Sequence, residues 1–240
     1  MKIIHLAEIN STNDYVKKNI LQLENLTAVY ADRQTSGRGR LERKWVDFGD
    51  DNLFLTIFLK PNNMIDQSIY PNFTQLLSVV LCMVIEEEFN LIPKIKWPND
   101  VLIDNKKIAG ILAEGTVHGG EFLGLALGIG VNLNTNNEKL DKIDKPATSV
   151  FTEIGEIVDK ELFLEKLLTK FCLMYDVFVC KGFPYIKTFY EKRAMFIGKN
   201  ISVNVLGEVH EGIAEGITDM GALLLREKTD INTYYIGDIL

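Results

Sequence analysis

The chain carries, at positions 33 to 45, the sequence Arg-Gln-Thr-Ser-Gly-Arg-Gly-Arg-Leu-Glu-Arg-Lys-Trp. Five of these thirteen residues are arginine or lysine, although the formal net charge of the 240-residue chain is −7. Gly37 and Gly39 let the backbone reach positive φ and approach a ligand closely. Arg38 and Arg40 offer planar, paired donors that suit phosphate or carboxylate groups. The segment is therefore predicted to be a loop that folds over an anionic ligand.

A basic segment of this kind has other interpretations, namely a solvated loop or a patch that contacts nucleic acid or membrane. Two features weaken them. An acidic chain is a poor non-specific binder of nucleic acid. In addition, Asp47, Asp50 and Asp51 follow Trp45 and confine the positive field to the loop. We therefore expect one small anionic ligand rather than a polyanion.

The composition is that of an ordinary globular protein, with 47% apolar and 25% charged residues. No apolar run approaches eighteen residues and no signal-peptide pattern opens the chain, so neither a transmembrane helix nor a leader is expected. Cys82, Cys172 and Cys180 form no CxxC pair and lie in apolar helical patterns. They predict buried, reduced thiols and a cytoplasmic location. The three histidines are scattered, and no structural metal site is predicted.

The first half of the chain predicts strands around one long helix. Residues 2–6 and 26–31 are typical of strands, and residues 53–59 of a central strand covered on both faces. Residues 66–89 carry apolar side chains at helical spacing and predict a helix lying on the sheet. Residues 11–14, Ser-Thr-Asn-Asp, have the form of a helix cap. A cap alone explains them, and a ligand-binding role stays open.

The middle of the chain holds polar residues among buried strands. Residues 96–100, Lys-Trp-Pro-Asn-Asp, form a turn cluster, which explains the proline and asparagine but not the lysine and tryptophan. Lys107 borders an apolar strand, either as an edge residue or with its ammonium in a cleft. Gly110, in mid-strand, suggests close approach of backbone to another group. Asn132 ends the strand at 122–131, as a turn former or as an amide that reads a ligand.

The pattern of apolar and polar residues changes near Phe196. Before it, Asp159 caps a long amphipathic helix that Gly182 and Pro184 end. After it, short alternating segments separated by glycine and aspartate turns predict a small antiparallel β domain of the barrel type. We therefore divide the chain into a domain of residues 1–195 and one of residues 196–240.

Taken together, the motifs resemble those of the biotin–protein ligases, also called biotin–[acetyl-CoA-carboxylase] ligases. The matching segments, in the family's order and spacing, are Ser11-Thr12-Asn13, Gln34 with Gly37-Arg38-Gly39-Arg40, Arg43 and Trp45, Lys96-Trp97-Pro98-Asn99-Asp100, Lys107 to Leu112, and Gly128 to Asn132. The resemblance implies an α+β fold: a mixed, mostly antiparallel sheet flanked by helices, like a class II aminoacyl-tRNA synthetase, with a small C-terminal SH3-like β-barrel. It also implies the short, monofunctional form without a DNA-binding domain.

The implied activity is that of an ATP-dependent ligase that makes an amide bond in two steps. Biotin is activated to biotinyl-5′-AMP with release of pyrophosphate and then transferred to a lysine of a biotin carboxyl carrier protein. Two alternatives stay open, a lipoate–protein ligase of the same fold and a non-catalytic regulator that binds biotin. A nucleic-acid binder ranks behind both, and we predict no nucleic-acid or membrane partner. The family often pairs through sheet edges, so a homodimer is also considered.

The resemblance assigns site residues in three overlapping groups. The catalytic residues are Lys107, Arg38, Arg40 and Asp100. The biotin-binding residues are Ser11, Thr12, Asn13, Gln34, Arg38, Gly39, Arg40, Lys107 and Gly110. The residues for ATP or the adenylate are Arg38, Arg40, Arg43, Trp45, Lys96, Asn99 and Asn132. Mg²⁺ is expected with ATP, near Asp100 if any protein group holds it, and the roles of Asp100, Asn99 and Asn132 are left open.

Overall fold

The computed structural model of the chain describes residues 1–40, 43–49, 52–61 and 66–240. A seven-stranded sheet forms its centre, in the order β1-β2-β3-β7-β6-β5-β4. Its strands are β1 (Ile3–Ile9), β2 (Thr27–Gln34), β3 (Asn52–Leu59), β4 (Lys94–Lys96), β5 (Asp100–Ile103), β6 (Lys106–His118) and β7 (Glu121–Asn132). Only the β1–β2 pair is parallel, and the other neighbours are antiparallel. This confirms the predicted mixed, mostly antiparallel sheet.

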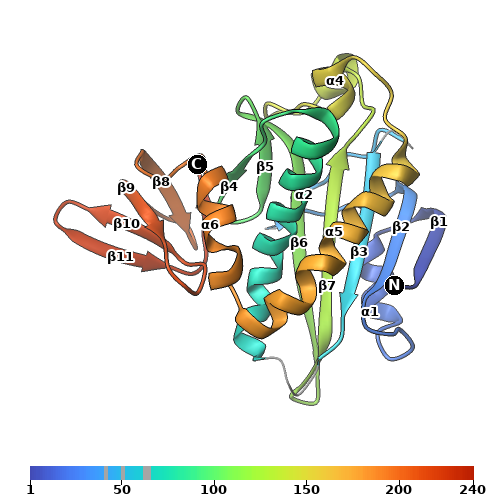
Figure 1. Cartoon of the computed structure of the whole chain (residues 1–240), viewed down its shortest axis with the longest axis horizontal. Coiled ribbons are helices and arrows are strands. Elements are labelled where there is room, and N and C mark those ends of the chain that lie inside the picture. Colours follow the sequence, from blue (N-terminus) through green and yellow to red (C-terminus); the bar gives the residue numbers. More distant parts are fainter. Residues whose placement is uncertain (41–42, 50–51, 62–65) are drawn as a thin grey trace.

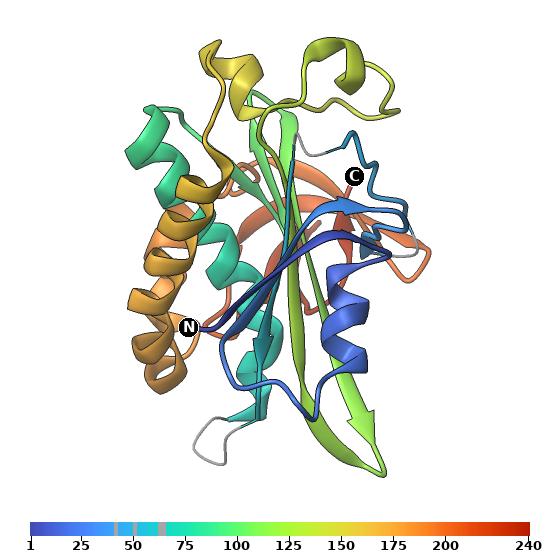
Figure 2. The same ribbon diagram turned by 90° about the vertical axis from the view of Figure 1, so that its right-hand side faces the viewer.

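Helices cover both faces of this sheet (Figure 2). One face carries α2 (Phe73–Phe89) and α5 (Lys160–Lys181), and the other carries α1 (Thr12–Lys18). Because β3 contacts both α1 and α5, its residues 53–59 are all buried, as its apolar sequence predicts. The shorter helices are α3 (Asn137–Leu140), α4 (Val150–Ile154) and α6 (Pro184–Arg193). Ser11 and Asp159 cap α1 and α5 with their side chains, which confirms both predicted caps.

The long helix predicted at 66–89 is divided in the structure. Gln67–Asn72 is a 3₁₀ helix containing Pro71, and the α-helix begins only at Phe73. Proline lacks the N–H that a continuous α-helix would need at this point. Residues Gln67–Phe89 together are long and apolar enough to cross a membrane, contrary to the expectation that the chain has no such stretch. However, 72% of the most apolar window is buried within the protein, which makes this a core helix.

A second, five-stranded antiparallel sheet is formed by the C-terminal residues, in the order β11-β10-β9-β8-β12 (Figure 1). Its strands are β8 (Asn200–Val205), β9 (Glu208–Ile217), β10 (Leu223–Glu227), β11 (Asp230–Tyr234) and β12 (Asp238–Ile239). It confirms the predicted antiparallel β unit. The apolar core runs without a break from the large sheet to side chains of the small one. The division between residues 195 and 196 therefore stays a prediction.

The three cysteines differ in environment. All are free, but only Cys82 is buried, while Cys172 is intermediate and Cys180 is exposed. The prediction of three buried thiols is therefore wrong for Cys180. It lies on the solvent-facing side of α5, two residues after the fully buried Phe178 and out of phase with the buried stripe. A cysteine in an apolar helical pattern is buried only where its phase places it on the core face.

Candidate active site

A cavity of about 660 Å³ opens on the α1 side of the large sheet and reaches the C-terminal sheet. Its walls come from α1, the arginine loop, strands β5 to β7, the segment 142–147 and the end of β12. All of the predicted site residues line it, namely Ser11, Thr12, Asn13, Gln34, Arg38, Gly39, Arg40, Arg43, Trp45, Lys96, Asn99, Asp100, Lys107, Gly110 and Asn132. Segments up to 121 residues apart in the sequence are thereby brought to one place.

One end of the cavity is polar and uncharged. The Thr12 backbone N–H and hydroxyl both donate to Gln34 Oε1, at 2.7 and 3.0 Å. The Thr12 hydroxyl in turn accepts from Thr56 Oγ1 at 2.8 Å. These bonds fix the Gln34 amide with its oxygen toward α1, so its NH₂ group is left to donate into the cavity. The hydroxyl of Ser11 accepts from the Asp14 N–H, and its own hydrogen remains available.

Asn13 lines the cavity, and its side-chain amide is bonded to the protein scaffold. Its Nδ2 donates to Leu112 O at 3.2 Å and to Glu114 Oε2 at 2.7 Å, and its Oδ1 accepts from Thr56 at 2.6 Å. Gly128 makes this approach of α1 to β7 sterically feasible, because a Cβ there would lie 2.2 Å from Asn13 Oδ1. Asn13 therefore fixes α1 on the sheet, and its role in binding biotin stays a prediction.

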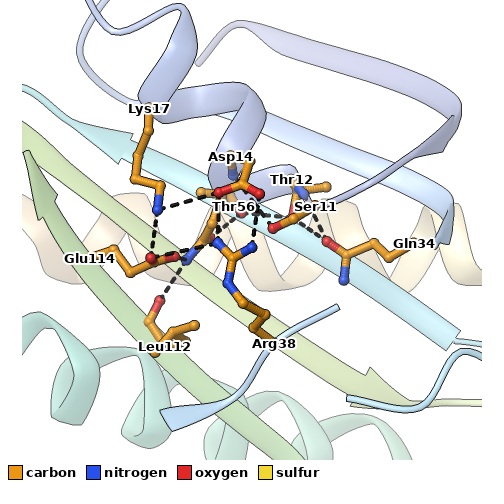
Figure 3. Close-up of polar contacts among 10 residues, drawn as sticks. Ser11, Thr12, Asp14, Lys17, Gln34, Arg38, Thr56, Leu112 and Glu114 are labelled. Atoms are coloured by element: carbon orange, nitrogen blue, oxygen red, sulfur yellow. Dashed lines mark hydrogen bonds and ion pairs between the residues drawn. The ribbon is translucent and has the colours of Figure 1, made fainter. Parts of the chain in front are cut away.

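Arg38 belongs to a cluster of four charged side chains beside this polar end (Figure 3). Its Nη1 donates to Asp14 Oδ2 at 2.8 Å and its Nη2 to Asp14 Oδ1 at 2.6 Å. Glu114 lies 3.7 Å from Arg38, and Lys17 bonds Glu114 at 2.6 Å. The hydrogen bond from Arg38 is the main reason why the pKa of Asp14 falls to about 2. We call Asp14, Lys17, Arg38 and Glu114 the Arg38 cluster.

Lys107 and Trp45 meet over a glycine floor in the middle of the cavity. Gly110 and Gly130 are cross-strand partners of β6 and β7. A Cβ on Gly110 would lie 2.8 Å from the Trp45 ring and 2.9 Å from Lys107 Nζ, and one on Gly130 would lie 2.6 Å from the same ring. Lys107 Nζ also bonds Asp100 at 2.7 Å and sits 5.4 Å from the indole centroid. Close approach at Gly110 is thus confirmed, and its neighbours are Trp45 and Lys107.

The far end of the cavity joins the loop to the C-terminal sheet. Arg40 Nη1 donates to Asp238 Oδ1 at 2.7 Å, to Gly237 O at 3.1 Å and to Asn99 Oδ1 at 3.4 Å. Arg43 lies 3.3 Å from the other oxygen of Asp238, which is buried and accepts no hydrogen bond from the described residues. Asp238 is thus a carboxylate between two loop arginines.

The remaining predicted residues frame these groups. Asn99 Nδ2 donates to Ile111 O and Asn132 Nδ2 donates to Thr148 O, at 2.8 and 3.0 Å, so each amide nitrogen is used by the protein. Burial lowers the pKa of the Lys96 ammonium, and the charges of Asp100 and Asp238 oppose this shift. No group of three or more His, Cys, Asp or Glu side chains that could hold a metal occurs in the described part of the chain.

Several residues that build the site were missed by sequence reasoning. They are Asp14, Lys17, Thr56, Glu114 and Asp238, together with residues 142–147. The sequence marks Asp14 only as an acid at the start of a helix. A signal did exist for Glu114 and Thr56, because a polar residue within a buried strand needs a partner. Nothing local marks Asp238, whose partner Arg40 lies 198 residues away.

Two family models match the chain. Residues 6–132 match the Biotin/lipoate A/B protein ligase family, and residues 196–240 match the Biotin protein ligase C terminal domain. Among solved structures, the biotin protein ligase from Aquifex aeolicus in complex with biotin and ATP superposes with a TM-score of 0.87 and 27% identity. That comparison covers 100% of this chain and 97% of the other.

Curated relatives are also similar over most of the chain. The Biotin--[acetyl-CoA-carboxylase] ligase of Paracoccus denitrificans is 34% identical over 223 residues, which are 92% of either chain. The Bifunctional ligase/repressor BirA of Bacillus subtilis is 35% identical over 214 residues, and the match spans 89% of this chain but 65% of that protein. With its N-terminal match covering more than half of its length, the chain belongs to the biotin/lipoate A/B protein ligase family.

Proposed function

We propose that the protein is an ATP-dependent biotin–protein ligase. In the first step a carboxylate oxygen of biotin attacks the α-phosphorus of Mg–ATP, the bond to the leaving oxygen breaks, and biotinyl-5′-AMP and pyrophosphate result. In the second step the amine of an acceptor lysine attacks the mixed anhydride, an amide bond forms, and AMP leaves. The acceptor is the lysine of a biotin carboxyl carrier domain.

The observation that carries this proposal is the order of three zones along one cavity. The uncharged polar end at Thr12 and Gln34 is followed by the glycine floor and then by the cations Lys107, Arg40 and Arg43. Strand register sets this order, since Gly128 pairs with Leu112 beside α1 while Gly130 pairs with Gly110 beneath Lys107. Biotin has the same order: a neutral ureido ring, an aliphatic tail and a carboxylate.

Cations are needed at the reacting end because a carboxylate and a triphosphate repel each other. Lys107 projects from the rigid strand β6 and is one-third exposed to the cavity. Its ammonium holds the biotin carboxylate against the α-phosphate in near-attack geometry. Arg40 and Arg43 lie on the other side and neutralise the phosphates. Trp45 covers the tail, and its buried Nε1–H, which bonds to none of the described residues, donates to the ligand.

The second step needs a neutral lysine amine. Asp100, which bonds Lys107 at 2.7 Å in the same cavity, is placed to orient the incoming amine or accept its proton. Mg²⁺ enters with the nucleotide as part of the substrate, and Asp100 and Asp238 are the carboxylates nearest to it in this cavity. The cytoplasmic location is supported by three free cysteines.

Biotin is favoured over lipoate by the match of residues 196–240, since that family model describes biotin protein ligases specifically. The experiment is biotin-dependent exchange of labelled pyrophosphate into ATP, with lipoate in a parallel sample. Exchange with biotin alone supports the proposal. Exchange with lipoate alone assigns the chain to the lipoate branch, and a folded protein that exchanges with neither is not an adenylating enzyme.

A further inference from the structure

Two arginines of the loop, Arg38 and Arg40, point to opposite sides of the cavity. Arg38 bonds to acids of α1 and β6, whereas Arg40 bonds to Asp238 of the C-terminal sheet. The backbone of this part of the loop pairs with residues 43–44. Arg38 forms an isolated antiparallel β-bridge with Lys44, and the Gly39 N–H donates to Arg43 O at 2.7 Å. Two side chains that look equivalent in the sequence therefore have different partners and different tasks.

The charge of Arg38 is balanced locally. Asp14 accepts both of its terminal nitrogens in a fork-to-fork pair, the strongest geometry for this contact. The Lys17 ammonium lies 2.6 Å from a carboxylate oxygen of Glu114 and balances its charge. The Arg38 cluster therefore contains two acids and two bases. The side chains are between 24% and 29% exposed, and water screens them only in part. Because Asp14 takes a hydrogen bond from each terminal nitrogen of Arg38, the guanidinium has fewer N–H groups left to offer a phosphate.

The same cluster is bonded to the polar end of the cavity. Glu114 Oε2 accepts from Asn13 Nδ2, and Asn13 Oδ1 accepts from Thr56 (Figure 3). The single hydroxyl hydrogen of Thr56 is shared with Thr12 Oγ1, which donates to Gln34. The loop backbone at Gly37 lies against this network. A Cβ on Gly37 would lie 3.2 Å from Gln34 Nε2, and Gly37 O accepts from the Trp45 N–H at 2.9 Å. Holding the Arg38 side chain in place therefore also holds the neighbouring Gly37, whose backbone lies between Gln34 and Trp45.

We propose that Asp14, assisted by Glu114, is a positioning residue that clamps Arg38 and thereby holds the loop over the biotin site. Arg38 is then an anchor that acts through backbone placement, and charge neutralisation at the phosphates falls to Arg40, Arg43 and Lys107. The kinetic part of this inference rests on the proposed ligase activity, but the anchoring of the loop does not.

The kinetic test is a double-mutant cycle of Asp14→Asn and Arg38→Met in biotin-dependent pyrophosphate exchange. Each single variant is expected to raise the KM for biotin about tenfold and to shorten the lifetime of bound biotinyl-5′-AMP by a similar factor, the loss typical of one charge-assisted pair. The KM for ATP stays within about twofold of wild type, and the double variant is no worse than either single one within the same margin. Asp14→Glu restores most of the loss.

Additive losses would overturn the proposal, because Arg38 would then act independently of Asp14. The proposal also fails if Asp14→Asn lowers the KM for ATP or raises the exchange rate, since Asp14 would then be an anion that competes with phosphate. If Asp14→Asn does not fold, the same cycle is run with Glu114→Gln. Asp219→Asn is the matched control, because its carboxylate pairs with Lys187 on an exposed surface.

The structural test is amide hydrogen exchange, which does not depend on activity. Asp14→Asn should speed exchange in peptides that cover residues 37–45, where Gly39 and Trp45 donate within the loop, and leave β3 unchanged. Unchanged exchange in the loop would refute the clamp. If wild type shows no pyrophosphate exchange, the ligase proposal fails while this measurement still decides the clamp.

Discussion

At the scale of single residues, the cavity places each of its principal cations beside a carboxylate of the protein. Lys107 bonds Asp100, Arg38 bonds Asp14, and Arg40 bonds Asp238. Such pairs hold long side chains in one rotamer and limit their repulsion from one another. The pairs differ in geometry. The Lys107 ammonium lies over the glycine floor and bonds one carboxylate, whereas Arg38 lies between two acids, Asp14 and Glu114.

Lys107→Ala is expected to reduce biotin-dependent pyrophosphate exchange by about two to three orders of magnitude, as for loss of one group that stabilises transition-state charge. The partly exposed pair with Asp100 contributes little to folding, so the melting temperature should change by no more than about 3 °C. Lys106→Ala, an exposed neighbour in the same strand, is the control. Normal exchange by a folded Lys107→Ala protein would contradict the assigned role.

The pKa of Asp14 predicts a pH dependence of stability. Its pKa lies near 2 in the fold and at 3.8 in a model compound, so the folded state favours the charged form. The stabilisation is therefore complete above about pH 4 and is lost as the pH falls toward 2. Allowing for solvent, it amounts to about 1–2 kcal/mol.

Urea unfolding of wild type and Asp14→Asn between pH 2 and pH 7 measures this contribution. The free energies of unfolding should differ by a constant amount above pH 4 and converge at about pH 2. A difference that persists unchanged to pH 2 would mean that Asp14 acts through something other than its charge.

At the scale of elements, strands β6 and β7 form the floor of the cavity because their paired glycines carry no side chain. Gly130 and Gly110 admit Trp45, and Gly128 admits Asn13 of α1. The same strands turn Ile111 and Ile129 to the opposite face, where they join the apolar core beneath α2. One strand pair thus serves both the core and the ligand channel.

Gly128→Ala is expected to destabilise the fold by about 2–3 kcal/mol, because the new methyl group would lie 2.2 Å from Asn13 Oδ1, which is held by its hydrogen bond from Thr56. α1 must move away from β7, and the KM for biotin should rise with it. Gly115→Ala in β6 is the control, since its Cβ meets only the Phe122 ring, at 3.2 Å. Chemical denaturation measures both, and equal stabilities for the two variants would contradict the close approach.

At the scale of the whole molecule, the site is closed by contact between two sheets. The large sheet supplies Lys107 and Asp100, and the C-terminal sheet supplies Asp238, which accepts from Arg40 at 2.7 Å and is 12% exposed. Because the loop lies between the two sheets, its position depends on how the sheets pack against each other. Figure 1 shows the small sheet beside α6 and β4.

Asp238→Asn should loosen the loop from the C-terminal sheet. The amide keeps the size of the side chain but loses the charge that attracts Arg40 and Arg43. We expect faster amide exchange in peptides covering residues 37–45 and 235–240, with a change in melting temperature below about 3 °C. Asp230→Asn at the exposed start of β11 is the control. Protection equal to wild type in both peptides would show that the ion pairs do not couple the sheets.

Much of the fold and of the site could be predicted from local patterns. The buried run at 53–59, the caps at Ser11 and Asp159 and the antiparallel strands after Phe196 are decided by side chains a few residues apart. The exposure of Cys180 and the late start of α2 depart from the prediction for local reasons. Cys180 is out of phase with the buried Phe178 of α5, and Pro71 lacks the N–H that a continuous α-helix needs.

The sequence by itself determined which chemical groups are available: a glycine-spaced arginine loop, a lysine on a buried strand and a polar turn at the start of α1. Only the tertiary structure decided their partners, because an ion pair depends on strand register and on the docking of two sheets. It separated Arg38 from Arg40 by giving one to Asp14, 24 residues away, and the other to Asp238, 198 residues away. Local spacing treats these arginines as equivalent, whereas the geometry of the fold gives them different partners on opposite sides of the cavity.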